Sequence, residues 1–312
     1  MLVAGIALTA VFLMATDFSA AKLPFINREI YSLLPGGFKP FWNSSGFNAN
    51  LAGGVLALFL PPALMLAVAG ESRLQRLAAL VTTVILSAML LLAQSRGALI
   101  AVVLILPAML VMYDRRWLWG CLAIVIAGAA YFIALQDRIS LEALLNQQGV
   151  GDVSSLEGRV ELWSRAIYVI QDFPFTGVGL GMFQPVVKLL YPTFIIAPDS
   201  AFDHAHNIYL QTAAEMGIPG LIAHLALYGI LGVLLVHRSI GHGRGRYRVI
   251  ALGLLGTLLV YLVHGVTDAV SFYLRTAFIV WSLFGLMVAV SITEGRDGTQ
   301  TMQVGVDGDR ES

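Results

Sequence analysis

Long runs without a charged side chain alternate with short polar segments along most of the chain. The runs that contain no Asp, Glu, Lys or Arg cover residues 1–16, 40–70, 77–95, 97–113, 117–136, 216–237, 249–267 and 276–293. A helix needs roughly 17–25 residues to cross the hydrocarbon core of a bilayer, and most of the runs suit this length. Lipid offers no partner for backbone groups, and alternating strand patterns are absent, so the runs predict helices. We expect an all-α integral membrane protein, a polytopic helical bundle of about eight spans.

Arginines in the short connections predict the orientation of this bundle. They fall at every second turn, at Arg73, Arg76, Arg115, Arg116, Arg238, Arg244, Arg246 and Arg248. Positive residues are enriched in cytoplasmic loops, so these turns are predicted to face the cytoplasm. The same alternation places residues 17–48, the turn at 95–97, the long segment 137–206 and the turn near 267–268 on the outer face. Both chain ends are then on the cytoplasmic side. The protein as a whole is predicted to lie in the inner (plasma) membrane.

The two ends of the chain differ from the rest of the bundle in their patterns. Small residues at 19–21 follow the first apolar run, as in a secretory signal, but the run lacks a basic segment before it. We therefore prefer a first span, which makes residues 1–293 a single transmembrane domain. The polar, Gly-rich segment 294–312 is predicted to be a disordered cytoplasmic tail.

Composition narrows the classes of function. The chain of 312 residues is 58% hydrophobic and only 12% charged, with a formal net charge of zero. No overall positive field exists to hold nucleic acid, so a nucleic-acid partner is not expected. A single cysteine, Cys121, excludes an intramolecular disulfide, a Cys-based zinc site and a paired redox centre.

The first polar feature that a membrane bundle does not require is Arg96. It lies between two apolar runs with almost no loop, on the predicted outer face. An arginine at a membrane interface can simply extend its head group to water. It can also bind an anion, because guanidinium keeps its charge at low dielectric and grips phosphate oxygens with two hydrogen bonds. Position alone leaves both interpretations open.

The second feature is the outer segment 137–206, which is longer than a bundle connection needs. Apolar residues at helical spacing, namely Leu162, Trp163, Ala166, Ile167 and Ile170, predict an amphipathic helix over 158–170 at the membrane surface. Arg159 then lies near the helix N-terminus, which itself attracts anions. The alternative is a solvated arginine paired with Glu161 or Asp172.

Three glycines follow this helix at alternate positions, Gly177, Gly179 and Gly181. They disfavour helix and predict a turn with a close backbone approach. The pattern lacks the Lys-Ser/Thr and the strand and helix of a phosphate-binding loop, so a nucleotide site is rejected.

The third feature is the pair His204 and His206. It lies immediately before a new predicted span that starts at Ile208, and Glu215 and the residues after it interrupt this span. Two histidines beside Asp203 could bind a metal, but no third His or Cys ligand has suitable spacing. A histidine is also suited to accept a proton near neutral pH. We therefore predict no metal site and assign His206 as a general base.

Taken in order, these segments resemble the O-antigen ligase and polymerase superfamily of bacterial envelope enzymes. The matching segments are Asn48-Ala49-Asn50-Leu51-Ala52, Ser95-Arg96-Gly97-Ala98, Gly158-Arg159 with Trp163, Asp172-Phe173-Pro174-Phe175-Thr176-Gly177-Val178-Gly179 with Phe183, His204-Ala205-His206-Asn207-Ile208-Tyr209-Leu210 and Glu215-Met216-Gly217-Ile218-Pro219-Gly220. The resemblance covers about residues 45–290. Family members usually have more spans before the Ser-Arg-Gly segment, so the chain is expected to be shortened at its N-terminus relative to them.

The resemblance implies a C-type glycosyltransferase that works without a cofactor or metal. Its donor is a glycan on a polyprenyl diphosphate (undecaprenyl diphosphate in bacteria), and its acceptor is a lipid, a glycan or a protein outside the cytoplasm. By motif, Arg96 and Arg159 hold the diphosphate and His206 is the base. His204, Asn207 and Glu215 are expected to support them.

Two other classes of function stay open. In a transporter or flippase of anionic lipid-linked sugars, the same arginines hold phosphate without chemistry, and no base is needed. A non-catalytic structural subunit is the third possibility. Arg165 and Arg275 match no motif of the superfamily, and no role is assigned to them.

Overall fold

All the charge-free runs of the sequence contain α-helix in the computed structural model of the protein. The structure describes residues 1–17, 47–134, 155–197, 200, 202–240, 246–272 and 276–292. The helices within the runs are α1 (Leu2–Ala15), α3 (Ala49–Ala57), α4 (Leu60–Ala69), α5 (Arg73–Ala93), α6 (Arg96–Tyr113), α7 (Trp117–Ala134), α11 (Ile208–Ile240), α12 (Arg246–His264) and α13 (Ala277–Ile292). Two short strands, β1 (Thr16–Asp17) and β2 (Phe47–Asn48), pair in parallel beside the start of α3.

Five of the described helical segments are long and apolar enough to cross a membrane. They are Ala49–Ala69, Arg73–Ala93, Arg96–Tyr113, Ile208–Ile240 and Tyr247–His264. Shorter apolar helices lie at Leu2–Phe12, Trp117–Ala127 and Ala277–Ile292. The prediction of a helical, multi-pass membrane protein is confirmed for the described residues, and the count of eight spans stays a prediction.

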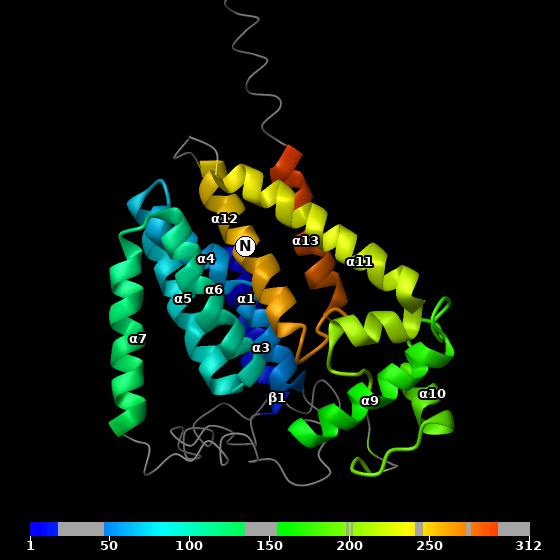
Figure 1. Ribbon diagram of the computed structural model, residues 1–312. Helices are drawn as coiled ribbons and strands as arrows, with labels where there is room; N and C mark the ends of the chain where they lie inside the picture. Colours follow the sequence, from blue (N-terminus) through cyan, green and yellow to red (C-terminus); the bar gives the residue numbers. More distant parts are fainter. Residues whose placement is uncertain are drawn as a thin grey trace, which may run out of the picture.

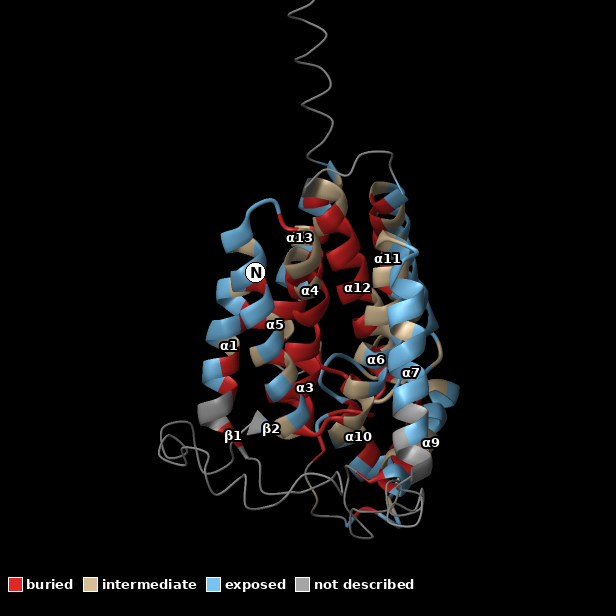
Figure 2. Ribbon diagram, turned by 90° about the vertical axis from the view of Figure 1, so that its left-hand side faces the viewer, coloured by how far each residue is buried: buried red, intermediate tan, exposed pale blue. Residues whose placement is uncertain are grey.

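The inner part of the bundle consists of α3, α4 and α12. Most of each of these helices is buried, whereas only a small part of α11 is (Figure 2). Leu56, Leu60, Leu252 and Tyr261 belong to one continuous apolar core that also includes residues of α5 and α13. The outward faces of α7 and α11 are apolar as well, as expected of helices in contact with lipid.

The two ends of the bundle differ in their connections. Figure 1 shows the α4–α5 and α6–α7 connections, the end of α11 and the start of α12 at one end, and the α5–α6 turn, α9 and α10 at the other. The predicted cytoplasmic arginines among the described residues are in these connections or in the helix ends beside them, and Arg244 lies outside the described residues. The arginine-bearing turns therefore share one end of the bundle, and the cytoplasmic location of that end stays a prediction. Most of 17–48 and the tail 294–312 lie outside the described residues.

The long segment between α7 and α11 contains the predicted surface helix. It is α9 (Leu156–Asp172), which begins at Ser155, whose side chain accepts a hydrogen bond from the Gly158 N–H at 3.0 Å. The buried face carries Leu162, Ala166 and Val169, at the spacing of one helix stripe. Ile167, which belongs to the apolar stripe predicted from the sequence, is exposed, because it lies on the other side of the helix from these buried residues.

This helix packs with α10 (Phe183–Leu190) and the first two turns of α11. Leu162, Phe183 and Ala214 belong to a second, smaller apolar core, separate from that of the bundle. The outer segment is therefore a small module with its own buried centre, positioned at one end of the bundle. Its contact with the membrane surface stays a prediction.

A close backbone contact joins this module to α11. The N–H groups of Val178 and Gly179 donate to the carbonyls of Ala214 and Glu215, at 3.0 and 2.9 Å. The N–H of Ile218 donates to the Pro174 carbonyl at 2.7 Å. The helix is interrupted here, where the backbone of Gly217 is extended with a positive φ of 71°. The predicted close approach at the glycine-rich turn is confirmed, and its partner is the interruption in α11.

Only glycine fits two of the positions in this contact. A Cβ at Gly177 would lie 2.3 Å from the Glu215 carbonyl carbon, and one at Gly217 would lie 2.4 Å from the Phe175 carbonyl oxygen. Gly181 also has a positive φ, but a Cβ there would meet nothing within 4 Å. The three positions thus separate the cost of backbone strain from the cost of a steric clash.

We expect alanine at Gly177 or Gly217 to destabilise the protein more than alanine at Gly181. The Gly181→Ala change costs about 1–2 kcal/mol from the left-handed backbone alone. The other two changes add a clash with backbone that cannot move aside. Thermal unfolding of the three variants in lipid nanodiscs would measure this order, and equal losses would show that the contact is not tight.

Candidate active site

The site begins at the tight turn between α5 and α6. Gln94 ends α5 in the left-handed conformation, with φ of 49°, and Ser95 immediately precedes α6. A Cβ at Gly53 would lie only 2.6 Å from the Ser95 Cβ, so α3 packs directly on the turn. Arg96 is the first residue of α6 and is partly buried.

Arg159 occupies the first turn of α9, as predicted. Its Nε is buried and has no hydrogen-bond partner among the described residues. The two carboxylates that were considered as alternative partners bind elsewhere. Glu161 binds Arg165 at 3.3 Å, and Asp172 accepts a hydrogen bond from the Tyr191 hydroxyl at 2.5 Å. The structure therefore gives no support to the solvated ion pair in the described part of the chain.

The two arginines lie in one electrostatic environment although 63 positions separate them in the sequence. The positive charge of Arg159 acts on the Arg96 guanidinium and on the His204 ring. Like charges held in proximity repel, which costs free energy until an anion neutralises them. This arrangement suits a site for a doubly or triply charged anion.

His206 lies at the same end of the bundle, in a strained backbone conformation. Its φ is 50°, in the left-handed region that non-glycine residues rarely adopt. Such strain is often found at functional sites, where the surrounding contacts hold it in place. Here the contacts come from Asn207 and from Asp268.

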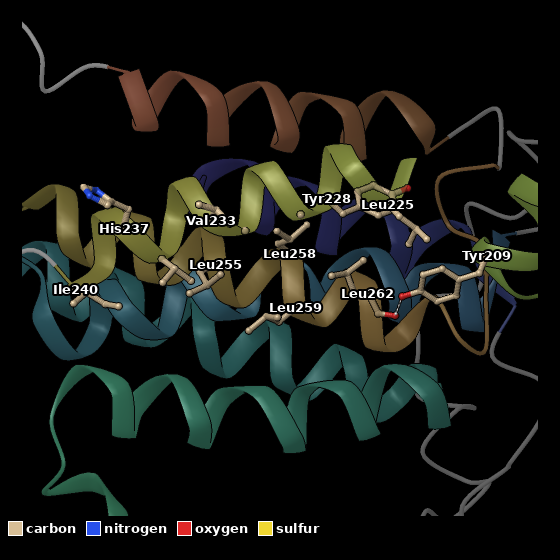
Figure 3. Close-up of a pocket in the computed structure, with 13 residues that line it drawn as sticks. Tyr209, Leu225, Tyr228, Val233, His237, Ile240, Leu255, Leu258, Leu259 and Leu262 are labelled. Atoms are coloured by element: carbon tan, nitrogen blue, oxygen red, sulfur yellow. Dashed lines mark hydrogen bonds between the residues drawn. The ribbon is translucent and has the colours of Figure 1, made fainter. Parts of the chain in front are cut away.

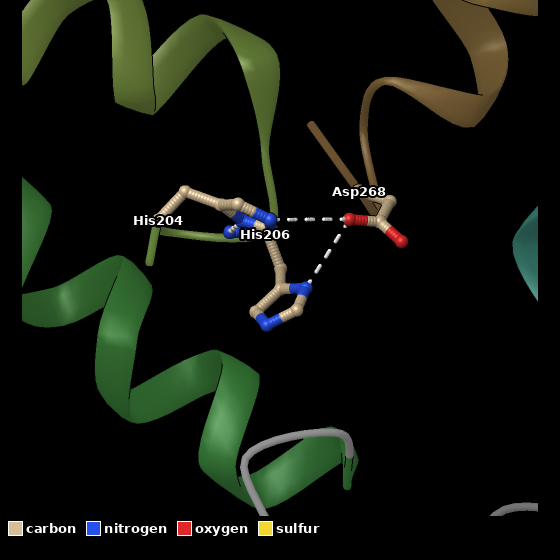
Figure 4. Close-up of side chains that lie close together, drawn as sticks. All are labelled: His204, His206 and Asp268. Carbon is tan, nitrogen blue, oxygen red and sulfur yellow. Dashed lines mark hydrogen bonds and ion pairs between the residues drawn. The ribbon is translucent and has the colours of Figure 1, made fainter. Parts of the chain in front are cut away.

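Asp268 is the residue of the site that the sequence did not assign. Its Oδ1 lies 3.3 Å from His206 Nδ1 and 3.8 Å from His204 Nε2, and all three side chains are buried. Figure 4 shows both rings directed at this oxygen, with the far nitrogen of His206 turned away from it. A signal for Asp268 was present, because a carboxylate in a turn on the predicted outer face lies on the same side as the histidines.

The hydrogen bonds determine the tautomers of the two histidines. His204 Nδ1 accepts from the His206 backbone N–H at 3.0 Å, so its proton is on Nε2, the atom that faces Asp268. His206 Nδ1 donates to Asp268, which leaves the lone pair on Nε2. His206 is thus arranged as a base whose ring is oriented by a carboxylate.

Burial and charge fix the protonation states around this pair. Burial lowers the pKa of His204 to about 3; the proximity of His206 and the positive charge of Arg159 act in the same direction, and Asp268 opposes them. Burial alone would raise the pKa of Asp268, but the hydrogen bond from His206 and the neighbouring histidines outweigh it and lower that pKa. His204 is therefore neutral and Asp268 ionised near neutral pH.

The same three side chains have the composition of a metal site. One ligand atom each from His204, His206 and Asp268 lies within 4.8 Å of the others. Histidine binds a metal through a nitrogen without a proton, yet both nitrogens that face Asp268 carry one in this network. The hydrogen bonds therefore favour a carboxylate that orients histidines over a metal centre.

Asn207 connects this cluster to both helices that approach it. Its Oδ1 accepts from the N–H groups of Tyr209 and Leu210, which caps the start of α11. Its Nδ2 donates to the Val266 carbonyl at 3.0 Å, two residues before Asp268. The expected supporting role of Asn207 agrees with this geometry.

The other two expected supporting residues, His204 and Glu215, make different contacts. His204 lies against His206, with ring centroids 4.3 Å apart in an edge-to-face arrangement. Glu215 is buried at the interruption of α11, and its carboxylate accepts from the Phe183 N–H at 3.3 Å. Glu215 therefore joins α10 to α11.

Arg165, to which no role was assigned, stabilises the outer module. Its Nε donates to the Pro192 carbonyl at 2.9 Å, and its guanidinium lies over the rings of Phe194 and Tyr168. Arg275 lies outside the described residues.

A comparison with known protein families gives one match. Residues 81–225 match a family model described as O-antigen ligase. This part of the chain is therefore similar to O-antigen ligases. The match includes Arg96, Arg159 and His206, and it ends before Asp268. No curated protein matches the chain.

Glu161 anchors a loop of the outer module, and the stability that it provides should depend on pH. The buried Glu161 carboxylate accepts from the N–H groups of Phe194, Ile195 and Ile196 at 2.5–3.1 Å. Burial would raise its pKa, but these hydrogen bonds and Arg165 lower it below the ordinary value. A lowered pKa means that the carboxylate stabilises the fold above its unfolded pKa of about 4.3, and that this stabilisation is lost as the pH falls through the folded value.

We expect Glu161→Gln to reduce hydrogen-exchange protection of these three amides at neutral pH, by about 2 kcal/mol in opening free energy. The difference from wild type should vanish under acidic conditions that protonate the carboxylate. Glu157→Gln, an exposed position one turn earlier, is the matched control and should have no effect. Equal protection in Glu161→Gln and wild type at neutral pH would contradict the anchoring role.

Proposed function

We propose that the protein is a glycosyltransferase that moves a glycan from a polyprenyl diphosphate to an acceptor hydroxyl on the extracytoplasmic face of the membrane. The observation that carries the proposal is the oriented pair of His206 and Asp268 at the same end of the bundle as two arginines. The similarity of residues 81–225 to O-antigen ligases supports the class of substrate.

In this reaction, His206 takes the proton of the acceptor. The acceptor oxygen attacks the anomeric carbon, and its proton passes to His206 Nε2. Asp268 positions the ring and stabilises the imidazolium that forms, because the carboxylate keeps its charge. One positioned base contributes about a hundredfold to ten-thousandfold in rate.

Arg96 and Arg159 act on the leaving group. As the bond from the anomeric carbon to the phosphate oxygen breaks, the electron pair stays on the diphosphate. Two guanidinium groups lower the barrier because they meet charge that develops in the transition state, and they act in a setting of low dielectric. This electrostatic set requires no cofactor.

An apolar groove supports a donor on a lipid chain. It lies between α11 and α12, has a volume of about 890 Å³, and extends from Tyr209 to Ile240. Figure 3 shows Tyr209 at one end of the groove and Ile240 at the other, with apolar side chains of both helices between them. Leu225 and Val233 are exposed at its edge, so a lipid could enter sideways from the membrane.

Position links this groove to the site. Tyr209 is three residues after His206, and its hydroxyl donates to the Leu262 carbonyl at 2.9 Å. A polyprenyl chain in the groove would therefore have its diphosphate near the end of the bundle that carries the arginines. The acceptor can be a lipid, a glycan or a protein, and the outer module is where it would be selected.

A transporter or flippase of the same lipid is less well supported. A carrier needs no base, and the family match is to a group of enzymes. The network of His206, Asp268 and His204 has no purpose in phosphate binding alone, since a buried carboxylate repels an anion.

We expect His206→Asn to lower glycan transfer by about a hundredfold to ten-thousandfold while donor binding stays within a few-fold of wild type. The assay uses the full chain in nanodiscs, a synthetic polyprenyl-diphosphate-linked oligosaccharide, and a set of lipid, glycan and protein acceptors. His224→Gln, at a histidine within α11 away from the site, is the control and should keep full activity. Full transfer by His206→Asn would refute the assignment of the base.

We expect Asp268→Asn to lower transfer by about a hundredfold or more, because an amide can reverse the tautomer of His206. The same change should leave the affinity for polyprenyl diphosphate unchanged or improved, since it removes a negative charge. Arg96→Gln should instead weaken donor binding. A loss of donor affinity in Asp268→Asn equal to that in Arg96→Gln would contradict the separate roles.

A further inference from the structure

The last residue of α12, His264, is a buried polar group that the proposed reaction does not use. Its side chain is almost completely buried, with 1% exposure. Both ring nitrogens are buried and have no hydrogen-bond partner among the described residues. A buried donor or acceptor left without a partner destabilises the fold, so an apolar residue would fill this space at lower cost. The imidazole therefore needs an explanation other than packing.

One glycine makes room for this ring, and a second lies beside it. A Cβ at Gly54 in α3 would lie 2.4 Å from His264 Nε2. A Cβ at Gly97 in α6 would collide first with the Thr267 hydroxyl and would lie 3.1 Å from His264 Nδ1. Any side chain at Gly54 would displace the ring. His264 is thus held between two helices, with Nδ1 directed toward the first turn of α6.

This end of α6 has the properties of an anion site. The helix has 18 residues, its first turn contains no acidic side chain, and Ser95 makes no side-chain capping hydrogen bond. The first N–H groups of a helix lack internal partners, and the helix dipole adds positive potential there. Arg96 is the first residue of this turn, and the positive charge of Arg159 acts on both Arg96 and His264.

Among the described residues, the negative charge that acts on His264 is that of Asp268. That carboxylate directs Oδ1 to His206 and His204, and its buried Oδ2 has no partner among the described residues. The Asp268 N–H donates to the His264 carbonyl at 3.0 Å, but the two side chains make no hydrogen bond with each other among the described residues. The ring nitrogens therefore lack a partner beside the first turn of α6, which begins at Arg96.

We propose that His264 is a further ligand of a phosphate group bound at the N-terminus of α6, to which it donates through Nδ1. The chemistry is that of a phosphate or diphosphate oxygen, and its source as the lipid-linked donor rests on the proposed function. Gly97 and Gly54 are then positions that keep the ring directed at the helix end. His264 binds the anion, and it takes no proton from the acceptor.

The test measures binding of two probes to the full chain in nanodiscs, inorganic diphosphate and polyprenyl diphosphate. His264→Phe keeps a planar ring but removes both nitrogens, and we expect it to weaken binding of both probes by about tenfold or more. His264→Gln keeps an N–H donor and should lose less affinity than His264→Phe. His224→Gln is the matched control and should bind both probes as wild type does.

A direct readout uses ¹⁵N-histidine labelling. The chain has six histidines, and the His264 resonances are assigned by their loss in His264→Gln. Addition of inorganic diphosphate should shift the His264 ring nitrogens, while those of His224 stay unchanged. A packing role would leave the His264 signals unmoved.

The outcomes separate this inference from the proposed function. Unchanged affinity for both probes in His264→Gln and His264→Phe, with weakened binding in Arg96→Gln, would overturn the role of His264 alone. Should His264→Phe fail to fold, His264→Gln and the ¹⁵N shifts decide.

If His264 variants lose diphosphate binding while His206→Asn retains transfer, the anion site stands and the proposed base is wrong. Loss of polyprenyl diphosphate binding without loss of inorganic diphosphate binding would place His264 with the lipid and overturn the phosphate contact.

Discussion

A buried, ionised carboxylate is the constraint around which one end of this bundle is organised. Asp268 is fully buried, and an isolated charge in such a position would cost many kilocalories per mole. The hydrogen bond from His206 compensates this cost, and it fixes the ring that gives the site its chemistry. The segment before α11 and the segment after α12 must therefore stay together. Backbone contacts secure this, because the Ile208 N–H donates to the Gly265 carbonyl at 2.8 Å.

The second requirement is that the outer module stays fixed relative to the bundle. Arg159 is on α9, whereas Arg96 and His206 belong to α6 and to the entry of α11. The backbone contact at Gly177 and Gly217 joins the turn after α9 to the interruption in α11. A break in a membrane helix is tolerated where other protein groups satisfy the freed backbone, and the glycine-rich turn does so here. The interruption of α11 thus serves as the attachment point of the module.

The polar side chains of the candidate site and the apolar groove occupy different parts of the bundle along its length. The arginines, histidines and Asp268 gather at one end, and the groove between α11 and α12 extends from there toward the arginine-bearing connections. An amphiphilic substrate with a charged head and a long apolar chain matches this separation. Weak screening at the polar end strengthens the interaction of the arginines with an anion.

The sequence by itself determined the helices, their apolar character and the residues with unusual chemistry. Charge-free runs of the right length leave only one backbone solution in lipid, and arginine or histidine in such surroundings needs a reason, so Arg96, Arg159 and His206 could be selected from position and motif. The tertiary structure decided which of these groups share a location. It brought Asp268, which the sequence placed only in a turn on the predicted outer face, to the histidines. It added His264, which stands in no recognisable local pattern, and it showed Ile167 on the exposed side of α9. The physical reason is that burial, tautomers and unpaired nitrogens depend on contacts between segments up to 200 positions apart, and local spacing carries no information about such contacts.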